Sequence, residues 1–293
     1  MDKNNSRIKK LWHDEEGVVG IVVAVLLIGL FITILTTIQT IYVPTWMEQK
    51  EAEHMENVAN QFSMLKFAID TQIIAEKSMP ISTPIELGSK EMPFFLSSKS
   101  FGSLEILDDE FALSVNTDAD GFLNYSFGTI KYTSKNAYFL DQDYIYEGGA
   151  IIMNQSKGSV TVIPPSFSME LDPYENDINL EFIIINISRV KEKTSVSGYG
   201  TYPIKTRFSE SMSPISVSGV NSITIKTSYV NAWETFFNHT LTESDDLEYG
   251  THFIISKINN GMELDFLTGT DWNKPNLDIK IYNVNAEVGP GWV

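Results

Sequence analysis

The chain has 293 residues, of which 43% are hydrophobic, and this is enough to form at least one substantial core. Its 38 acidic residues outnumber its 21 basic residues and give a formal net charge of -17. We expect no nucleic-acid partner, because such a surface repels phosphate backbones. The sequence contains no cysteine, which excludes disulfide bonds, thiolate metal sites and cysteine nucleophiles.

The first predicted element is a run of 26 uncharged residues, 18–43. At ~1.5 Å per helical residue it spans roughly 39 Å, which exceeds the ~30 Å hydrocarbon core of a bilayer. A buried helix of a soluble protein is rarely so long and so apolar on every side. We therefore predict a transmembrane helix over 18–43.

The residues before this run set its orientation. Four basic side chains lie in the leader 1–17, whereas the stretch 44–60 has only Lys50. Positive charge on one flank of a membrane span keeps that flank in the cytoplasm. We predict a cytoplasmic basic leader over 1–17 and a translocated C-terminal part that carries all of the net negative charge.

The junction between the leader and the apolar run reads Glu16-Gly17-Val18-Val19. It resembles the class III (prepilin-type) signal peptide of archaeal type IV pilin-like proteins, in which a charged residue, Gly or Ala and two apolar residues mark the processing site. The resemblance implies that a prepilin peptidase cuts between Gly17 and Val18. Bacterial-type pilins usually have a glutamate five residues into the mature chain, where this chain has Val22, and many archaeal members also lack it. An uncleaved signal anchor is the alternative, because the leader and the span suffice for anchoring.

Apolar residues recur at spacings of three and four after Pro44, which predicts an amphipathic helix over 44–79. The proline is expected to kink the helix or to open a new one, and a linker around Pro80 and Pro84 is expected to end it. The apolar positions are Ala52, Met55, Val58, Phe62, Leu65, Ile69 and Ile73. The polar residues between them, which include Glu48, Glu51, Glu53 and Lys66, are expected to face water.

This arrangement resembles the long N-terminal helix of type IV pilins, whose first half anchors the precursor and whose second half packs on a globular head. The resemblance implies a homo-oligomer or filament that forms through residues 18–43 and requires no cofactor. A parallel coiled coil is the other interpretation of the apolar stripe over 44–79. Packing on the chain's own head is favoured, because the stripe covers barely three heptads.

The period of the hydrophobic pattern changes to two after the linker, which predicts an extracellular β-rich head over 80–293. The pieces Phe101-Gly102 and Phe127-Gly128 indicate consecutive strands with similar turns. Asn231 is expected to cap a short helix. Strands are expected around residues 104–106, 150–153, 159–163, 180–187, 223–226, 252–258 and 277–281. We predict an α+β fold, in which a long N-terminal transmembrane and amphipathic helix precedes an antiparallel β-sandwich-like head.

Few residues form patterns that indicate chemistry. Asn116, Asp118 and Asp120 match the opening of a calcium loop, but Phe127 stands where the closing glutamate would be, and an Asx-rich hairpin turn explains the same residues.

The four histidines lack zinc-ligand spacing. The acidic pairs at 108–109 and 245–246 are expected to be solvated loop residues. The usual motifs for acyl transfer, nucleotide hydrolysis and dinucleotide binding are absent, so we expect no metal centre, no catalytic residues and no enzymatic activity.

Glycosylation sequons occur in the part of the chain that is expected to lie outside the cell. Asn124, Asn154 and Asn238 are candidate glycosylation sites, whereas Asn186 lies in an apolar strand in which a glycan would fit poorly. Residues 122–146 are rich in aromatic side chains, which either stack on sugars or partners or, as we favour, pack in the core.

These patterns predict a pilin-like, membrane-anchored surface protein, a subunit of a type IV pilus-like filament for adhesion or surface structure. It would lie in the cell membrane with an extracellular C-terminal head, or in an extracellular filament after processing. The alternative is a non-polymerising, signal-anchored receptor or adhesin that binds a glycan, an ion or an envelope protein. A tethered hydrolase that uses loop carboxylates is a third class, and no motif favours it.

Overall fold

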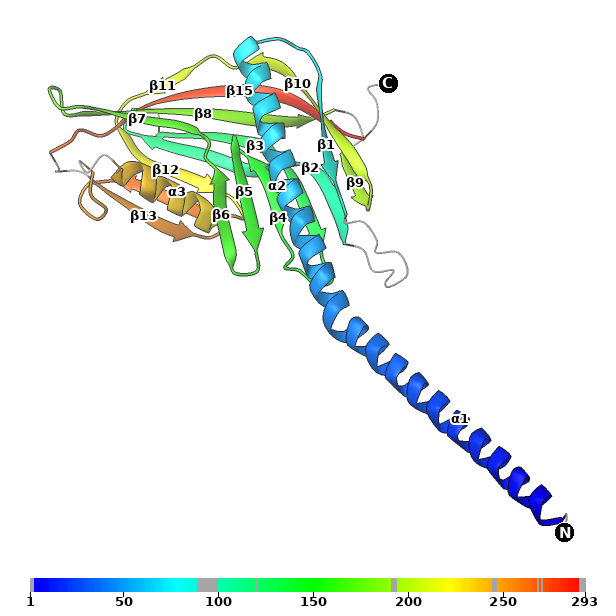
Figure 1. Cartoon of the computed structure of the whole chain (residues 1–293). Coiled ribbons are helices and arrows are strands. Elements are labelled where there is room, and N and C mark those ends of the chain that lie inside the picture. Colours follow the sequence, from blue (N-terminus) through cyan, green and yellow to red (C-terminus); the bar gives the residue numbers. More distant parts are fainter. Residues whose placement is uncertain are drawn as a thin grey trace.

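A long helix and a β-rich head make up the protein in the computed structural model (Figure 1). The structure describes residues 3–88, 100–119, 121–190, 194–243, 247–267, 269 and 271–289, with side chains from Val19 onward. The predicted fold class is confirmed, because a long N-terminal apolar helix precedes mostly antiparallel sheets.

The helix is one long rod in three consecutive parts, α1 (Lys3–Thr37), the π-helical turn η1 (Ile38–Tyr42) and α2 (Val43–Ala75). Pro44 lies in the first turn of α2. The ring of a proline inside an α-helix clashes with the carbonyl group four residues before it. The wider π-helical turn before Pro44 makes room for this ring. The rod continues through the proline and ends at Ala75, where Glu76 adopts a left-handed conformation with φ of 47°.

The predicted linker around Pro80 and Pro84 is wrong in its second half. Residues Ile81–Glu86 form strand β1, which pairs antiparallel with β10 (Thr201–Ser211) and places Pro84 opposite Pro203. Because β1 is an edge strand, a residue without a backbone N–H is tolerated there.

One sheet has six strands in the order β1-β10-β15-β8-β7, with β11 also paired to β15. Its pairings are antiparallel except that β8 and β15 run parallel, in register from Asn179 opposite Asn276 to Arg189 opposite Ala286. The remaining strands of this sheet are β7 (Ser166–Asp172), β8 (Asp177–Arg189), β11 (Ile215–Val217) and β15 (Asn276–Val288).

The second sheet has nine strands in the order β13-β14-β12-β2-β3-β4-β5-β6, with β9 also paired to β2, and its pairings are antiparallel. Its strands are β2 (Phe101–Thr117), β3 (Gly121–Lys135), β4 (Asp143–Glu147), β5 (Ala150–Gln155), β6 (Gly158–Ile163), β9 (Ser195–Gly198), β12 (Val220–Lys226), β13 (Phe253–Ile258) and β14 (Gly261–Phe266).

The two Phe-Gly pieces lie within the consecutive strands β2 and β3, so the strands are confirmed but the predicted turns are wrong. Glycine is required at both places for close approach of backbones. A Cβ on Gly128 would collide with the carbonyl oxygen of Ile187 in the other sheet, and one on Gly102 would collide with that of Leu87. Gly128 therefore lets β3 and β8 approach closely.

Two buried clusters hold the head together. The first lies between the sheets and helix α3 (Val230–Thr242) and contains Trp233 and Phe237. The second lies beneath α2 and joins Phe62 and Leu65 to residues of both sheets. Asn231 does not cap α3, because the helix begins at Val230 and the Asn231 side chain accepts a hydrogen bond from Lys257 Nζ at 2.8 Å.

Candidate functional site

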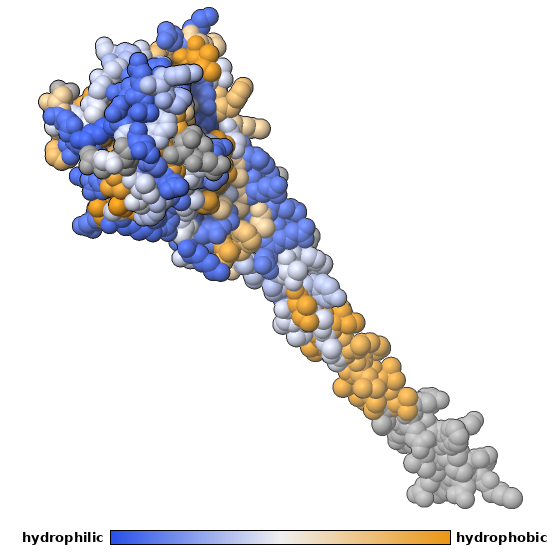
Figure 2. Space-filling view, turned by 90° about the vertical axis from the view of Figure 1, so that its left-hand side faces the viewer, coloured by the Kyte–Doolittle hydropathy of each residue, from blue (hydrophilic) through white to orange (hydrophobic). Residues whose placement is uncertain are grey.

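The apolar part of the rod, residues 19–42, extends beyond the head, and its described side chains are exposed except for the half-buried Ile38. Leu27 is 60% exposed and Phe31 is 61% exposed, and among the side chains described in this segment none is buried. Figure 2 shows apolar side chains on the visible face of the helix below the head. The mean hydropathy of its most apolar 18-residue window is 2.9, so the helix is long enough and apolar enough to cross a membrane.

Three hydroxyl groups of this segment are satisfied within the helix. The hydroxyls of Thr33, Thr37 and Thr40 each donate to the carbonyl oxygen four residues earlier, at 2.8, 2.9 and 2.8 Å. Lipid offers no hydrogen-bond partners, so such internal bonds make the segment compatible with hydrocarbon. Gly20 and Gly29 have open space around the position of a Cβ, which allows a second helix to approach closely.

The environment of the helix changes at Val43, which is buried, as is Met47. From there the inner face of α2 packs on the head. The ring of Phe62 lies 6.4 Å from that of Tyr132 and 5.9 Å from that of Tyr144, measured between centroids. Tyr132 and Tyr144 belong to the aromatic-rich stretch 122–146, and their burial confirms that this stretch contributes to the core.

Glu51 was expected to face water, and this prediction is wrong. Its side chain is fully buried, and its two oxygens accept hydrogen bonds from the backbone N–H groups of Ala137 at 3.0 Å, Tyr138 at 2.7 Å and Phe139 at 2.7 Å. The carboxylate thus fixes the β3–β4 loop to α2. Lys66, another residue of the predicted polar face, is also buried and lies 3.1 Å from Asp70.

His54 and Tyr132 form a second polar link between α2 and the head. His54 Nε2 lies 3.1 Å from the Tyr132 hydroxyl, which donates to the carbonyl oxygen of Leu87 at 3.2 Å. Burial lowers the pKa of His54, so the neutral form is favoured at this contact. These links and the packing of Phe62 hold α2 at a fixed position on the head.

Glu147 forms a further buried contact, at the turn between β4 and β5. Its carboxyl group accepts hydrogen bonds from Thr227 Oγ1 at 2.6 Å and from Trp233 Nε1 at 2.7 Å. Burial raises the pKa of Glu147 to about 7, because the charged form is poorly solvated there. The group connects the β4–β5 turn to α3.

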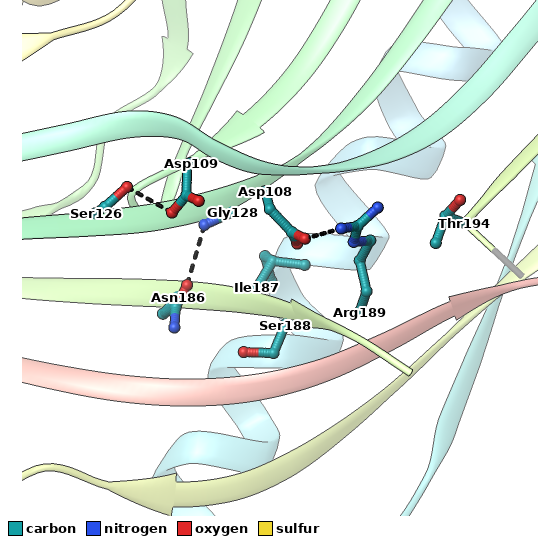
Figure 3. A pocket seen from close by; sticks show the side chains of 9 residues that line it. All are labelled: Asp108, Asp109, Ser126, Gly128, Asn186, Ile187, Ser188, Arg189 and Thr194. Atoms are coloured by element: carbon teal, nitrogen blue, oxygen red, sulfur yellow. Dashed lines mark hydrogen bonds and ion pairs between the residues drawn. The ribbon is translucent and has the colours of Figure 1, made fainter. Parts of the chain in front are cut away.

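A polar cleft of about 770 Å³ lies between the two sheets (Figure 3). It forms where β2 bulges between Leu107 and Phe111, so Asp108 and Asp109 lie on a strand bulge and not in the predicted loop. Asp109 has a φ of 58°, which is strained for a residue other than glycine. The lining residues are Asp108, Asp109, Ser126, Gly128, Asn186, Ile187, Ser188, Arg189 and Thr194.

The charged groups of this cleft are already paired with each other or with neighbours. Asp108 forms an ion pair with Arg189, and Asp109 accepts a hydrogen bond from Ser126 Oγ at 2.7 Å. Gly128 N donates to Asn186 Oδ1 at 3.0 Å (Figure 3). The cleft is therefore lined by both donor and acceptor groups, and its two carboxylates already have partners.

Of the predicted calcium residues, Asp118 is already bound by other side chains. Asp118 lies in the turn between β2 and β3, where its carboxylate binds Lys274 Nζ at 2.7 Å and Asn221 Nδ2 at 2.9 Å. The hydrogen bond from Lys274 lowers the pKa of Asp118. Asn116 is a residue of β2, and Asp120 lies outside the described residues. Within the described ranges, no group of three or more His, Asp or Glu side chains is placed to hold a metal ion.

The candidate glycosylation sites differ in exposure. Asn124 and Asn238 are exposed, whereas Asn154 is half-buried and lies 3.4 Å from Asp143. The side chain of Asn186 donates to Asn283 Oδ1 at 2.8 Å in addition to accepting from Gly128, so its amide nitrogen, where a glycan would be attached, is already hydrogen-bonded.

The predicted processing site and the acidic pair at 245–246 lie partly or wholly outside the described residues. Gly17 and Val18 have helical backbones within α1, and their side chains lie outside the described part of the chain. The acidic pair at 245–246 is also outside it.

Comparison with protein families identifies the chain as a member of a family of unknown function, DUF7289, whose model matches residues 17–261. The match includes the apolar segment, α2 and most of the head. No match was found among curated proteins or among solved structures.

Proposed function

We propose that this member of DUF7289 is a pilin-like, membrane-anchored surface protein and a subunit of a type IV pilus-like filament. One observation carries the proposal: a single helix is apolar and uncovered over residues 19–42 and then packs on the head from Val43 onward. Such a segment needs an apolar environment, and either lipid or equivalent helices of other copies provide it.

The resemblance of Glu16-Gly17-Val18-Val19 to a class III signal peptide supports processing by a prepilin peptidase before Val18. The leader before this point carries four basic and four acidic side chains, which a bundle of apolar helices would have to bury or exclude. Removing it lets residues 18–43 leave the membrane for a filament core.

The test is N-terminal sequencing and intact-mass measurement of the protein from native membranes and from sheared filaments. We expect filament subunits to begin at Val18. Gly17→Phe should leave the chain at full length and exclude it from filaments, whereas Gly20→Phe, a matched change in bulk within the same helix, should still be processed. A chain that keeps residue 1 and never enters filaments contradicts the proposal.

The polar cleft favours a second candidate function, that of a non-polymerising surface receptor or adhesin whose head binds a glycan. Under this alternative the apolar segment is a permanent anchor, and the Gly17→Phe variant should function normally. Binding of the full chain to immobilised neutral oligosaccharides, compared between the unmodified chain and Ser188→Tyr, tests the cleft itself. Equal binding by both chains would exclude the cleft as the site.

A further inference from the structure

The outward side of α2, opposite the head, changes character along its length. Exposed side chains recur there at spacings of three and four. The lower part of this line is polar and contains Glu53, Glu56, Asn57 and Asn60. The upper part contains Met64, Phe67, Thr71 and Ile74, and we call these four residues the upper seam. Phe67 is 74% exposed and Ile74 is 85% exposed, which is unusual for such large apolar side chains.

Thr71 is the one polar residue of the upper seam, and it adds no unsatisfied hydrogen-bond donor to this surface. The Thr71 hydroxyl donates to the carbonyl oxygen of Phe67 at 2.7 Å, so its donor is satisfied within the helix. Lys66 and Asp70, two charged residues of the same stretch of α2, lie 3.1 Å apart and form an ion pair. The seam therefore offers a second helix an uncharged surface.

The spacing of 64, 67, 71 and 74 is that of alternating a and d positions of a coiled coil. Phe67 is 25 residues beyond Tyr42, which corresponds to ~37 Å of helix. An upright helix that holds residues 19–42 in lipid therefore carries the seam well above the bilayer. Lipid does not cover the seam, and a protein surface must do so.

We propose that the upper seam binds the upper seam of a second copy of this chain, in a parallel two-helix contact between membrane-anchored molecules. Identical anchors hold two copies in the same direction and at the same height, so each seam meets its equal in an isologous contact. Four residues per helix bury far less than the ~800 Å² per partner of a stable soluble interface. The contact therefore depends on the high local concentration that anchoring provides.

This inference rests on the membrane anchor and not on filament formation. It is tested by disulfide cross-linking of the full chain in native membranes, because the protein has no cysteine of its own. Phe67→Cys places a thiol at the centre of the seam. Tyr174→Cys is the matched control, because Tyr174 is 97% exposed in the turn between β7 and β8 and reports random collision.

After mild oxidation we expect the Phe67→Cys dimer to exceed the control dimer by about tenfold, the gain that a specific contact provides over collision in the same membrane. Adding Ile74→Asp should reduce the Phe67→Cys yield to that of the control. Equal yields for the two single-cysteine chains overturn the inference. Filaments of processed subunits without Phe67→Cys dimers would overturn the seam contact and leave the proposed function intact. Dimers without filaments would support the seam contact and contradict the proposed function.

Discussion

Two regions of one continuous helix, residues 19–42 and residues 43–75, are α-helical apart from the π-helical turn at 38–42, and they have opposite surroundings. The first is apolar on every side and uncovered, whereas the second has a buried inner face and an outer face that includes Glu53 and Asn60. Helix formation alone does not distinguish them. The distribution of apolar side chains around the helix axis distinguishes them. A helix that is apolar on every side requires an apolar solvent, whereas a helix with a single apolar stripe requires a packing partner for that stripe.

The largest effect should come from placing charge in the first region. Leu27→Arg with Phe31→Arg adds two charges at the middle of the proposed span, at roughly 5–7 kcal/mol of insertion free energy in total. We expect the protein to be released from membranes by alkaline carbonate. The matched pair Met64→Arg with Phe67→Arg, on α2, should remain in the membrane fraction. If both variants stayed in the membrane fraction, residues 19–42 would not differ from α2 in their need for lipid.

The second region should respond to loss of apolar volume instead. Phe62→Ala removes a buried ring that packs on Tyr132 and Tyr144, and it should lower the free energy of unfolding by about 3–5 kcal/mol. Phe67→Ala, one and a half turns away on the exposed side, should change it by less than about 0.5 kcal/mol. Denaturation of the full chain in detergent measures both. Similar effects from both substitutions would mean that α2 does not pack as described.

The pH dependence of stability separates the head from the span, because residues 18–41 contain no ionisable side chain. The pKa of Glu147 rises from its usual 4.5 to about 7, so its neutral form stabilises the folded head. This stabilisation of about 3 kcal/mol is complete below pH 4.5 and is lost as the pH rises through 7. Glu147→Gln should remove this pH-dependent fall in the free energy of unfolding. The fraction of the unmodified chain that resists extraction from membranes by carbonate should not depend on the pH at which the membranes were incubated beforehand. An unchanged decline in the variant would assign it to other groups.

A smaller effect should follow from the polar contact that fixes α2 above the span. Glu51→Gln replaces one oxygen of a buried carboxylate, which accepts hydrogen bonds from three backbone N–H groups, with an amide donor, and it should lower the free energy of unfolding by about 2 kcal/mol. Glu53→Gln, on the exposed side, provides the control and should leave stability unchanged. Faster amide hydrogen exchange at residues 137–139 in Glu51→Gln alone would locate the effect, and unaltered exchange there would contradict it.

The sequence was sufficient for the elements whose signal is local. The uncharged run 18–43 and the stripe that includes Phe62 and Leu65 predict the two regions of the helix. The alternating and apolar runs predict strands β2, β5, β6, β8, β12, β13 and β15. Burial of Glu51 was missed because its partners lie 86 to 88 residues away, and a carboxylate between polar neighbours indicates a solvated face. Pairing of β1 was missed because Pro84 indicates a chain break, although an edge strand accepts it.

The polar cleft had a weaker signal still. Asp108 and Asp109 read as surface loop residues, and Arg189 lies at the end of a strand 81 residues beyond Asp108. Only the bulge in β2 and the close approach of β3 to β8 at Gly128 bring these residues together. Local sequence patterns do not encode the parallel pairing of β8 with β15 that positions this strand, because parallel neighbours are distant in the chain.

The most direct test of the contrast within the helix is cysteine labelling with a membrane-impermeant maleimide on intact cells. Leu27→Cys and Asn60→Cys each introduce a single thiol into a chain that has none. We predict that Asn60→Cys is labelled on intact cells, and that Leu27→Cys is labelled only after detergent dissolves the membrane. Equal labelling of both positions without detergent would show that residues 19–42 are not embedded in lipid.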